Sequence, residues 1–132
     1  MSSMIRPIIA IVGRPNVGKS TLFNRLVGRR RALVRDTPGV TRDRLYGRVS
    51  FERWQATVID TGGFDPSSQE PLIEGVRRQV LAAVDEADLV LFVVDARDGA
   101  TALDLEIARI LRRADRVVVL AANKVDAGAQ ES

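Results

Sequence analysis

Residues 13 to 20 read GRPNVGKS, and this stretch directly follows the apolar run Ile8 to Val12. It leads into Lys19 to Val27, a helix candidate that Gly28 would terminate. A strand that ends in Gly-x-x-x-x-Gly-Lys-Ser and continues into a helix is typical of a phosphate-binding loop, because backbone N–H groups at the start of the helix face the phosphate oxygens. The sequence therefore predicts such a loop at the carboxyl end of the first strand.

Side-chain roles in this loop follow from the residue types. Gly13 and Gly18 let the backbone bend so that consecutive N–H groups point at one phosphate group. Lys19 would place positive charge near the β- and γ-phosphates, and Ser20 offers a hydroxyl to Mg²⁺. The rest of the chain has to decide which phosphate compound this loop binds.

The composition restricts the chemistry that the chain can perform. The chain has 132 residues, enough for one domain, and it contains neither cysteine nor histidine. Disulfides, Cys/His metal sites, cysteine nucleophiles and histidine bases are therefore excluded. Catalysis has to use carboxylates, backbone amides, lysine, hydroxyls or a bound ion.

The charge is mildly basic, with a formal net charge of +3. Much of the excess falls in arginines between residues 29 and 48: Arg29, Arg30, Arg31, Arg35, Arg42, Arg44 and Arg48. This cluster can face RNA or form a solvated surface loop, and the sequence leaves both interpretations open. Among the 20 basic residues only Lys19 and Lys124 are lysines, which indicates that these two sites need a compact ammonium group.

Apolar runs alternate with segments of helical period along the chain. The strand candidates are Ile8 to Val12, Gly47 to Phe51, Gln55 to Ile59, Leu89 to Val94 and Val117 to Ala122, and the helix candidates are Lys19 to Val27, Pro71 to Val84 and Thr101 to Ala114. The short turn near Arg53 predicts an antiparallel hairpin. The alternation predicts an α/β fold with a mostly parallel, doubly wound sheet that binds ligands at the carboxyl ends of its strands. No apolar run approaches the roughly 18 to 20 residues that span a bilayer, so we expect a cytoplasmic protein without membrane contact.

A second polar motif, Asp60-Thr61-Gly62-Gly63, follows the third strand candidate. Asp60 can hold Mg²⁺ through a water molecule. The N–H of Gly63 can bond a γ-phosphate that is present only before hydrolysis.

A third motif, Asn123-Lys124-Val125-Asp126, follows the last strand candidate. The carboxylate of Asp126 can accept from the ring N–H and the amino group of guanine, whereas adenine would leave it unpaired. Asn123 would fix the loop, and the Lys124 stem would lie over the base plane. This motif therefore predicts selection of GTP and GDP over ATP.

With three motifs in this order, the chain resembles translation-factor-type P-loop GTPases. It is most similar to the first G domain of the Der (EngA) family of bacterial ribosome-assembly GTPases. The resemblance rests on residues 13 to 26, on Pro-Gly-Val-Thr-Arg-Asp-Arg at 38 to 44, on Asp-Thr-Gly-Gly at 60 to 63 and on Val-Asp-Ala-Arg at 94 to 97. Related Era and TrmE proteins carry Asp-Thr-Ala-Gly at the second motif. Nearly all of the chain is covered.

The motifs and the resemblance together imply a set of site residues. Contacts to the guanine nucleotide are expected from Gly13, Arg14, Pro15, Asn16, Val17, Gly18, Lys19, Ser20, Thr21, Asp60, Thr61, Gly62, Gly63, Asn123, Lys124 and Asp126. Ser20, Thr41 and Asp60 would hold Mg²⁺, with Thr37 as the alternative to Thr41. Lys19, Thr41 and Gly63 would act on the reacting phosphate. Asn16 matches a residue that helps to bind K⁺ in related GTPases, and it can equally be a turn residue.

Phe64 occupies the position at which Ras-like enzymes carry the glutamine that orients the attacking water. The sequence therefore predicts slow hydrolysis driven by charge neutralisation. The resemblance implies a monomer that contacts the large ribosomal subunit and rRNA. Two alternatives remain open: a nucleotide-sensing module with negligible turnover, and an RNA-contact fragment with no nucleotide preference.

The chain ends six residues after Asp126. Members of the resembled family continue into a further helix, a sixth strand with a Ser-Ala contact to guanine, and a last helix. We therefore expect residues 1–132 to form an incomplete G domain with exposed apolar surface beside Val117 to Ala122.

Overall fold

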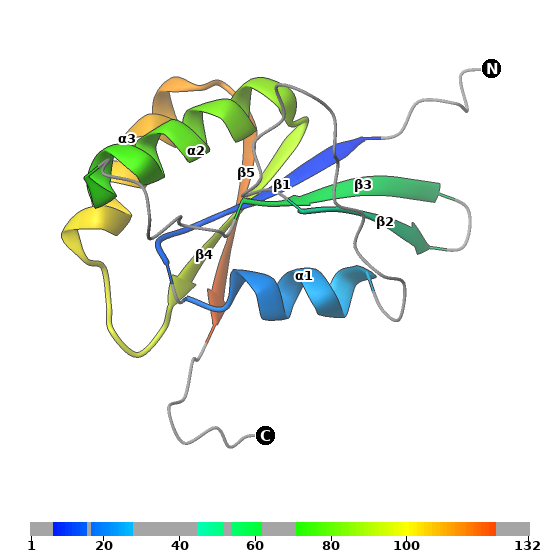
Figure 1. Ribbon diagram of the computed structural model, residues 1–132, viewed down its shortest axis with the longest axis horizontal. Helices are drawn as coiled ribbons and strands as arrows, with labels where there is room; N and C mark the ends of the chain where they lie inside the picture. The colour runs from blue at the N-terminus through cyan, green and yellow to red at the C-terminus, as the bar shows by residue number, and fades with distance from the viewer. Residues whose placement is uncertain (1–6, 16, 28–44, 52–53, 62–70, 124–132) are drawn as a thin grey trace.

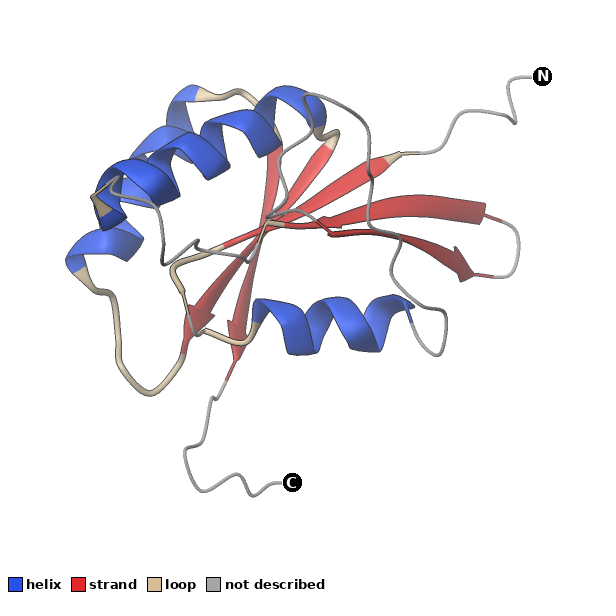
Figure 2. Ribbon diagram, in the orientation of Figure 1, coloured by secondary structure: helices blue, strands red, loops and turns tan. Residues whose placement is uncertain are grey.

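The fold is a five-stranded sheet with helices on both faces (Figures 1 and 2). The computed structural model describes residues 7–15, 17–27, 45–51, 54–61 and 71–123. In chain order the elements are β1 (Ile8–Val12), α1 (Lys19–Val27), β2 (Leu45–Phe51), β3 (Trp54–Asp60), α2 (Leu72–Glu86), β4 (Leu89–Asp95), α3 (Ala102–Arg113) and β5 (Val117–Asn123).

The strand order is β2-β3-β1-β4-β5. Strand β1 lies in the centre and runs parallel to β3 and to β4, and β4 runs parallel to β5. Only the pair of β2 and β3 is antiparallel, as the turn near residue 53 predicts. The predicted fold class, a mostly parallel doubly wound α/β sheet, is confirmed.

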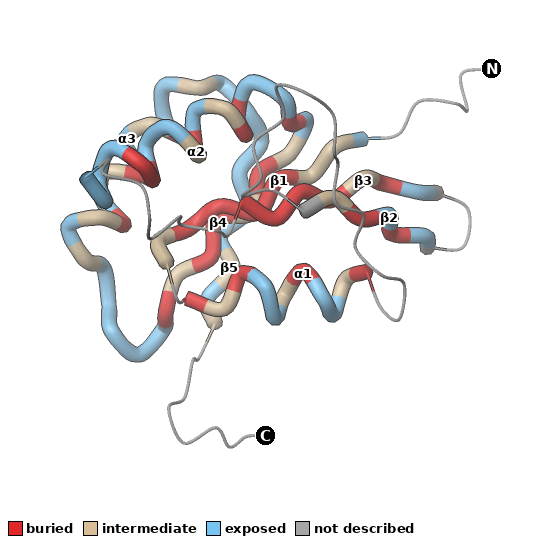
Figure 3. Tube along the Cα trace, viewed as in Figure 1, coloured by how far each residue is buried: buried red, intermediate tan, exposed pale blue. Residues whose placement is uncertain are grey.

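Alternating side chains of the inner strands build two separate cores. Buried residues lie along the central strands of the sheet (Figure 3). Ala10 and Val12 of β1 face α2 and α3, whereas Ile11 faces α1. Strand β4 divides in the same way, with Val90 on one face and Val93 on the other. Because successive residues of a strand point to opposite faces, a strand covered by helices on both sides has to be apolar throughout.

Local signals set most of the element boundaries. Helix α3 starts with a capping box, in which Thr101 Oγ1 accepts from the N–H of Asp104 at 3.2 Å and Asp104 Oδ2 accepts from the N–H of Thr101 at 3.0 Å. The predicted bounds of β1 and α1 are confirmed. Strand β2 begins two residues before the predicted Gly47, and α2 begins after Pro71 and continues to Glu86, beyond the predicted Val84.

Strand β5, at the end of the strand order, is apolar and exposed on both faces, as the sequence predicts. Val117 and Leu120 are 62% and 64% exposed, and Val118 and Val119 are also exposed. Within the described part of the chain, helices long and apolar enough to cross a membrane are absent.

Candidate nucleotide-binding site

The three sequence motifs begin at one edge of the sheet. The register places Ile11 of β1 beside Asp60 of β3, and Asp95 of β4 beside Asn123 of β5. Because β1, β3, β4 and β5 are parallel, their carboxyl ends meet at the same edge, where open α/β sheets bind ligands.

The phosphate loop follows β1 and packs against β4. A Cβ atom added at Gly13 would lie 2.6 Å from the carbonyl oxygen of Val93, so a larger residue would push the loop off the sheet. Gly18 has a φ of 97°, which favours glycine just before α1. The two glycines thus hold the loop close to the sheet and turn it into the helix.

Lys19 is folded back into the loop. Its Nζ donates to the carbonyl oxygen of Gly13 at 2.8 Å and to that of Arg14 at 2.9 Å, and the residue is only 5% exposed. The pKa of Lys19 is lowered to about 8, mainly by burial; the nearby carboxylate of Asp60 opposes this shift and Arg14 adds to it. A buried cation in a loop of backbone amides is suited to bind an anion.

The second motif contacts the first through a hydroxyl and a carboxylate. Ser20 Oγ donates to Asp60 Oδ2 at 3.2 Å, and Asp60 is 2% exposed at the end of β3. Thr61 Oγ1 donates to the carbonyl oxygen of Ile11 at 2.7 Å, which ties the motif to β1. Oxygen ligands of this kind fit Mg²⁺, which usually takes one or two protein oxygens and completes its shell with water and substrate phosphates.

The third motif also reaches the phosphate loop. Asn123 Nδ2 donates to the carbonyl oxygen of Val17 at 3.1 Å, although the two residues are 106 positions apart in the sequence. The carbonyl oxygen of Asn123 accepts from the N–H of Ala96, beside the end of β4. The start of the Asn-Lys-x-Asp segment is therefore anchored to the loop that follows β1.

Arg14 is among the expected nucleotide contacts, but the sequence indicates no partner for its side chain. In the structure its Nη2 lies 2.9 Å from Asp98 Oδ2, and its Nε lies 3.4 Å from Asp104 Oδ2. The spacing Thr-x-x-Asp at 101 to 104 indicates a helix start, but nothing in the sequence connects that start to residue 14.

Several predicted site residues lie outside the described residues. They are Asn16, Thr37, Thr41, Gly62, Gly63, Phe64, Lys124 and Asp126. Their roles stay predictions. The structure brings together the remaining members: Gly13, Arg14, Pro15, Val17, Gly18, Lys19, Ser20 and Thr21 with Asp60, Thr61 and Asn123.

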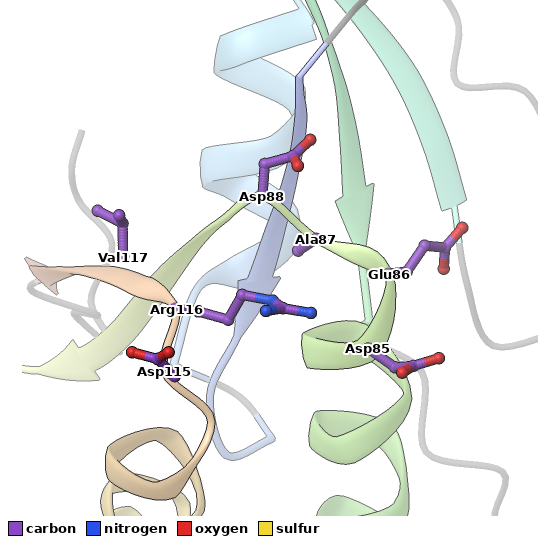
Figure 4. Close-up of a pocket in the computed structure, with 7 residues that line it drawn as sticks. All are labelled: Asp85, Glu86, Ala87, Asp88, Asp115, Arg116 and Val117. Carbon is purple, nitrogen blue, oxygen red and sulfur yellow. The ribbon is translucent and has the colours of Figure 1, made fainter.

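A groove of about 390 Å³ lies at the opposite edge of the sheet (Figure 4). It is lined by Asp85, Glu86, Ala87, Asp88, Asp115, Arg116 and Val117, at the amino ends of β4 and β5. Arg116 Nε donates to the carbonyl oxygen of Val84 at 3.0 Å, which ties the segment before β5 to α2. The groove is therefore separate from the site at the carboxyl ends.

A family model described as 50S ribosome-binding GTPase matches residues 8–124. The chain belongs to the 50S ribosome-binding GTPase family. This membership agrees with the order of the three motifs and with the fold. The matched segment is therefore a GTPase domain.

Curated relatives make the resemblance more specific. GTPase Der of Myxococcus xanthus is 60% identical over 122 residues, which are 92% of this chain and 27% of the relative. GTPase Der of Geotalea daltonii is 55% identical over 97% of this chain and 29% of the relative. The predicted resemblance to the Der family is confirmed. The chain spans less than a third of the length of these relatives.

Solved structures share the fold. Aquifex aeolicus Era bound to GDP and AlF₄⁻ superposes with a TM-score of 0.70 at 33% identity, over 96% of this chain and 44% of that one. The G domain of the T. maritima FeoB iron transporter superposes with a TM-score of 0.66 at 28% identity, over 89% of this chain and 72% of that one. Both are nucleotide-binding folds of the predicted class.

Proposed function

We propose that this chain binds GTP and hydrolyses it slowly to GDP and phosphate. The observation that carries the proposal is the joining of three motifs at one sheet edge, through the 3.2 Å contact of Ser20 with Asp60 and the 3.1 Å contact of Asn123 with Val17. A phosphate loop, a hydroxyl beside a carboxylate, and the start of the segment expected to read guanine therefore adjoin one another at this edge. Membership of the GTPase family supports the same function.

The phosphate-binding roles follow from the geometry. Lys19 would exchange its two carbonyl partners, Gly13 and Arg14, for oxygens of the β- and γ-phosphates. Ser20 and Asp60 would hold Mg²⁺, together with Thr41. When bound, Mg²⁺ would supply positive charge that offsets the negative charge of the phosphates.

The hydrolytic step has to proceed without a glutamine after the second motif, because Phe64 occupies that position. Lys19 would stabilise the charge that develops on the transferred phosphoryl group. The N–H of Gly63 would bond a γ-phosphate oxygen, and K⁺ beside Asn16 would add positive charge. Backbone groups or a partner would hold the attacking water, so slow turnover is expected.

Guanine recognition would come from Asn123, Lys124 and Asp126. The test is calorimetric titration of GDP, GTP and ATP into the chain and into Asp126→Asn. We expect the unmodified chain to prefer GTP over ATP by about 10⁴-fold or more, and the variant to lose most of this preference, because a buried hydrogen-bonding group selects strongly against a ligand that leaves it unpaired.

The matched control is Asp115→Asn, which removes a carboxylate at the opposite edge of the sheet. Asp115 has a φ of 57°, which asparagine also tolerates, so the control should fold and keep the GTP preference. Equal affinity of the unmodified chain for ATP and GTP would refute the proposal.

Phe64 favours a second candidate function, a nucleotide-responsive binding module with negligible turnover. Release of phosphate from GTP, measured in KCl and in NaCl, separates the two. Turnover in either salt above the rate of a Lys19→Ala variant supports an enzyme, and stimulation by KCl alone supports the proposed K⁺ site.

We propose the large ribosomal subunit as the partner. The matching family is described as 50S ribosome-binding, which supports the large subunit. Era, 32% identical with a TM-score of 0.68, has been solved with nucleotides 1506–1542 of 16S rRNA, which is small-subunit RNA and therefore supports contact with rRNA in general. The arginines between residues 29 and 48 supply charge for an RNA surface. Co-sedimentation with 50S subunits should be stronger with a GTP analogue than with GDP. Equal co-sedimentation with both would argue against a GTP-dependent switch, and loss of contact at slightly raised salt would indicate nonspecific binding.

A further inference from the structure

Arg14 connects two segments that are far apart in the sequence. Its Nη2 lies 2.9 Å from Asp98 Oδ2 in the segment between β4 and α3, and its Nε lies 3.4 Å from Asp104 Oδ2 in the first turn of α3. The side chain of Arg14 is 16% exposed, and those of Asp98 and Asp104 are 55% and 4% exposed. One end of this contact is therefore largely shielded from solvent, so removal of Arg14 would leave the buried carboxylate of Asp104 uncompensated.

Asp104 is fixed independently of Arg14. Its Oδ2 accepts from the N–H of Thr101, and its own N–H donates to Thr101 Oγ1, so the carboxylate is part of the cap of α3. Its other oxygen, Oδ1, is buried and has no hydrogen-bond donor among the described residues. Among the described residues, Arg14 supplies the positive side chain that compensates the carboxylate of Asp104. The N-terminus of α3 adds a partial positive charge.

The other side of Arg14 faces the ammonium of Lys19. The carbonyl oxygen of Arg14 accepts from Lys19 Nζ at 2.9 Å, next to the carbonyl oxygen of Gly13. One residue therefore holds two carboxylates with its side chain and the phosphate-binding lysine with its backbone.

We propose, building on the proposed binding of GTP, that Arg14 is a positioning residue: Asp98 and Asp104 hold its side chain and thereby keep the phosphate loop in the shape that binds the diphosphate. The residue need not touch the nucleotide with its side chain. The segment from β4 into α3 then serves as the outer support of the loop.

The loss of this support should shorten the lifetime of bound nucleotide. The test measures the dissociation rate of fluorescent methylanthraniloyl-GDP from the full chain, displaced by excess GDP. We expect Arg14→Gln to dissociate GDP roughly threefold to tenfold faster, a range typical of residues coupled through one network. Arg14→Lys should restore part of the loss, because it keeps the charge.

The dissociation rate is read only from molecules that have bound GDP, so a smaller folded fraction does not change it. If Arg14 only helped the chain to fold, Arg14→Gln would lower the amplitude of the fluorescence signal but leave the dissociation rate of GDP unchanged. Asp98→Asn and Asp104→Asn should each raise the rate, and adding Asp98→Asn to Arg14→Gln should change it little, because both remove the same contact.

Arg77→Gln is the matched control. Arg77 Nη2 lies 2.7 Å from Glu106 Oε2 and joins α2 to α3 as Arg14 joins the loop to α3, but it does so away from the phosphate loop. Fluorescent GDP should dissociate from Arg77→Gln at the same rate as from the unmodified chain.

Three outcomes decide the matter. An unchanged rate in Arg14→Gln overturns the proposal. If that variant does not fold, unchanged rates in both Asp98→Asn and Asp104→Asn overturn it instead. No binding of GDP by the unmodified chain refutes the proposed function itself, and this result is distinct from the other two.

Discussion

Lys19 carries its charge in a largely dry environment, which makes the stability of the nucleotide-free chain depend on pH. Its pKa falls from an ordinary 10.5 to about 8 in the folded state. Between these two values the unfolded chain binds the proton and the folded chain does not, so stability rises with pH there. The contribution of Lys19 is complete above pH 10.5 and is lost progressively as the pH falls from there to about 8.

Chemical unfolding of the chain and of Lys19→Met, both freed of nucleotide and divalent ions, measures this contribution. We expect the stability of the unmodified chain, relative to the variant, to rise by about 2 to 3 kcal/mol from about pH 7.5 to about pH 10.5. Subtracting the unfolding free energy of Lys19→Met from that of the unmodified chain cancels the contributions of the other titrating groups. A difference that stays constant over this pH range would show that Lys19 is solvated or paired more fully than its contacts indicate.

The packing of α1 on the hairpin depends on one small residue of β2. A Cβ atom at Gly47 would lie 2.6 Å from Val27 Cγ2 and 3.0 Å from Phe23 Cζ, both in α1. Gly47→Ala should therefore destabilise the chain by about 1 to 3 kcal/mol, because the helix has to move away from the strand. Thermal or urea unfolding measures the loss.

A second variant identifies the cause of that loss. Val27→Ala removes the methyl groups that the new side chain would meet, so Gly47→Ala with Val27→Ala should be more stable than the sum of the two single effects implies. If the two changes in the free energy of unfolding simply add, the loss in Gly47→Ala arises within strand β2 and not from the contact with Val27.

At the scale of the whole molecule, the site joins segments that follow three different strands, so nucleotide binding should stabilise the entire sheet. With GDP and Mg²⁺ at about a hundred times Kd, the free energy of unfolding should rise by about 2.7 kcal/mol. Thermal unfolding with GDP, and with ATP at the same concentration, measures the rise, and ATP should give little.

Adjacent hydroxyl residues provide the matched pair for this measurement. Ser20→Ala removes the hydroxyl beside Asp60. It should abolish the Mg²⁺-dependent part of the stabilisation by GDP, which is the part that EDTA removes from the unmodified chain. Thr21→Ala, at the next position, removes a hydroxyl that is expected to contact the nucleotide but not Mg²⁺, so it should keep the dependence on Mg²⁺ even if GDP binds more weakly. Equal behaviour of the two variants would exclude Ser20 as a metal ligand.

The sequence predicted the fold class, the order of the elements and three motifs at strand ends, because each depends on local signals. Apolar runs, the spacing Gly-x-x-x-x-Gly-Lys-Ser and the terminator Gly28 are complete within a few residues. Boundaries were less well predicted at β2 and α2, where pairing with β3 and packing on the sheet extend the element past its local pattern.

Only the tertiary structure decided which side chains meet across the site. The contacts of Arg14 with Asp98 and Asp104 join residues 84 and 90 positions apart, and Asn123 reaches Val17 across 106. No periodicity encodes such pairs, because they follow from the parallel register that brings the ends of β1, β4 and β5 to one edge. The sequence thus determined what the phosphate loop is, and the folding of the β4–α3 segment against it decided what supports it.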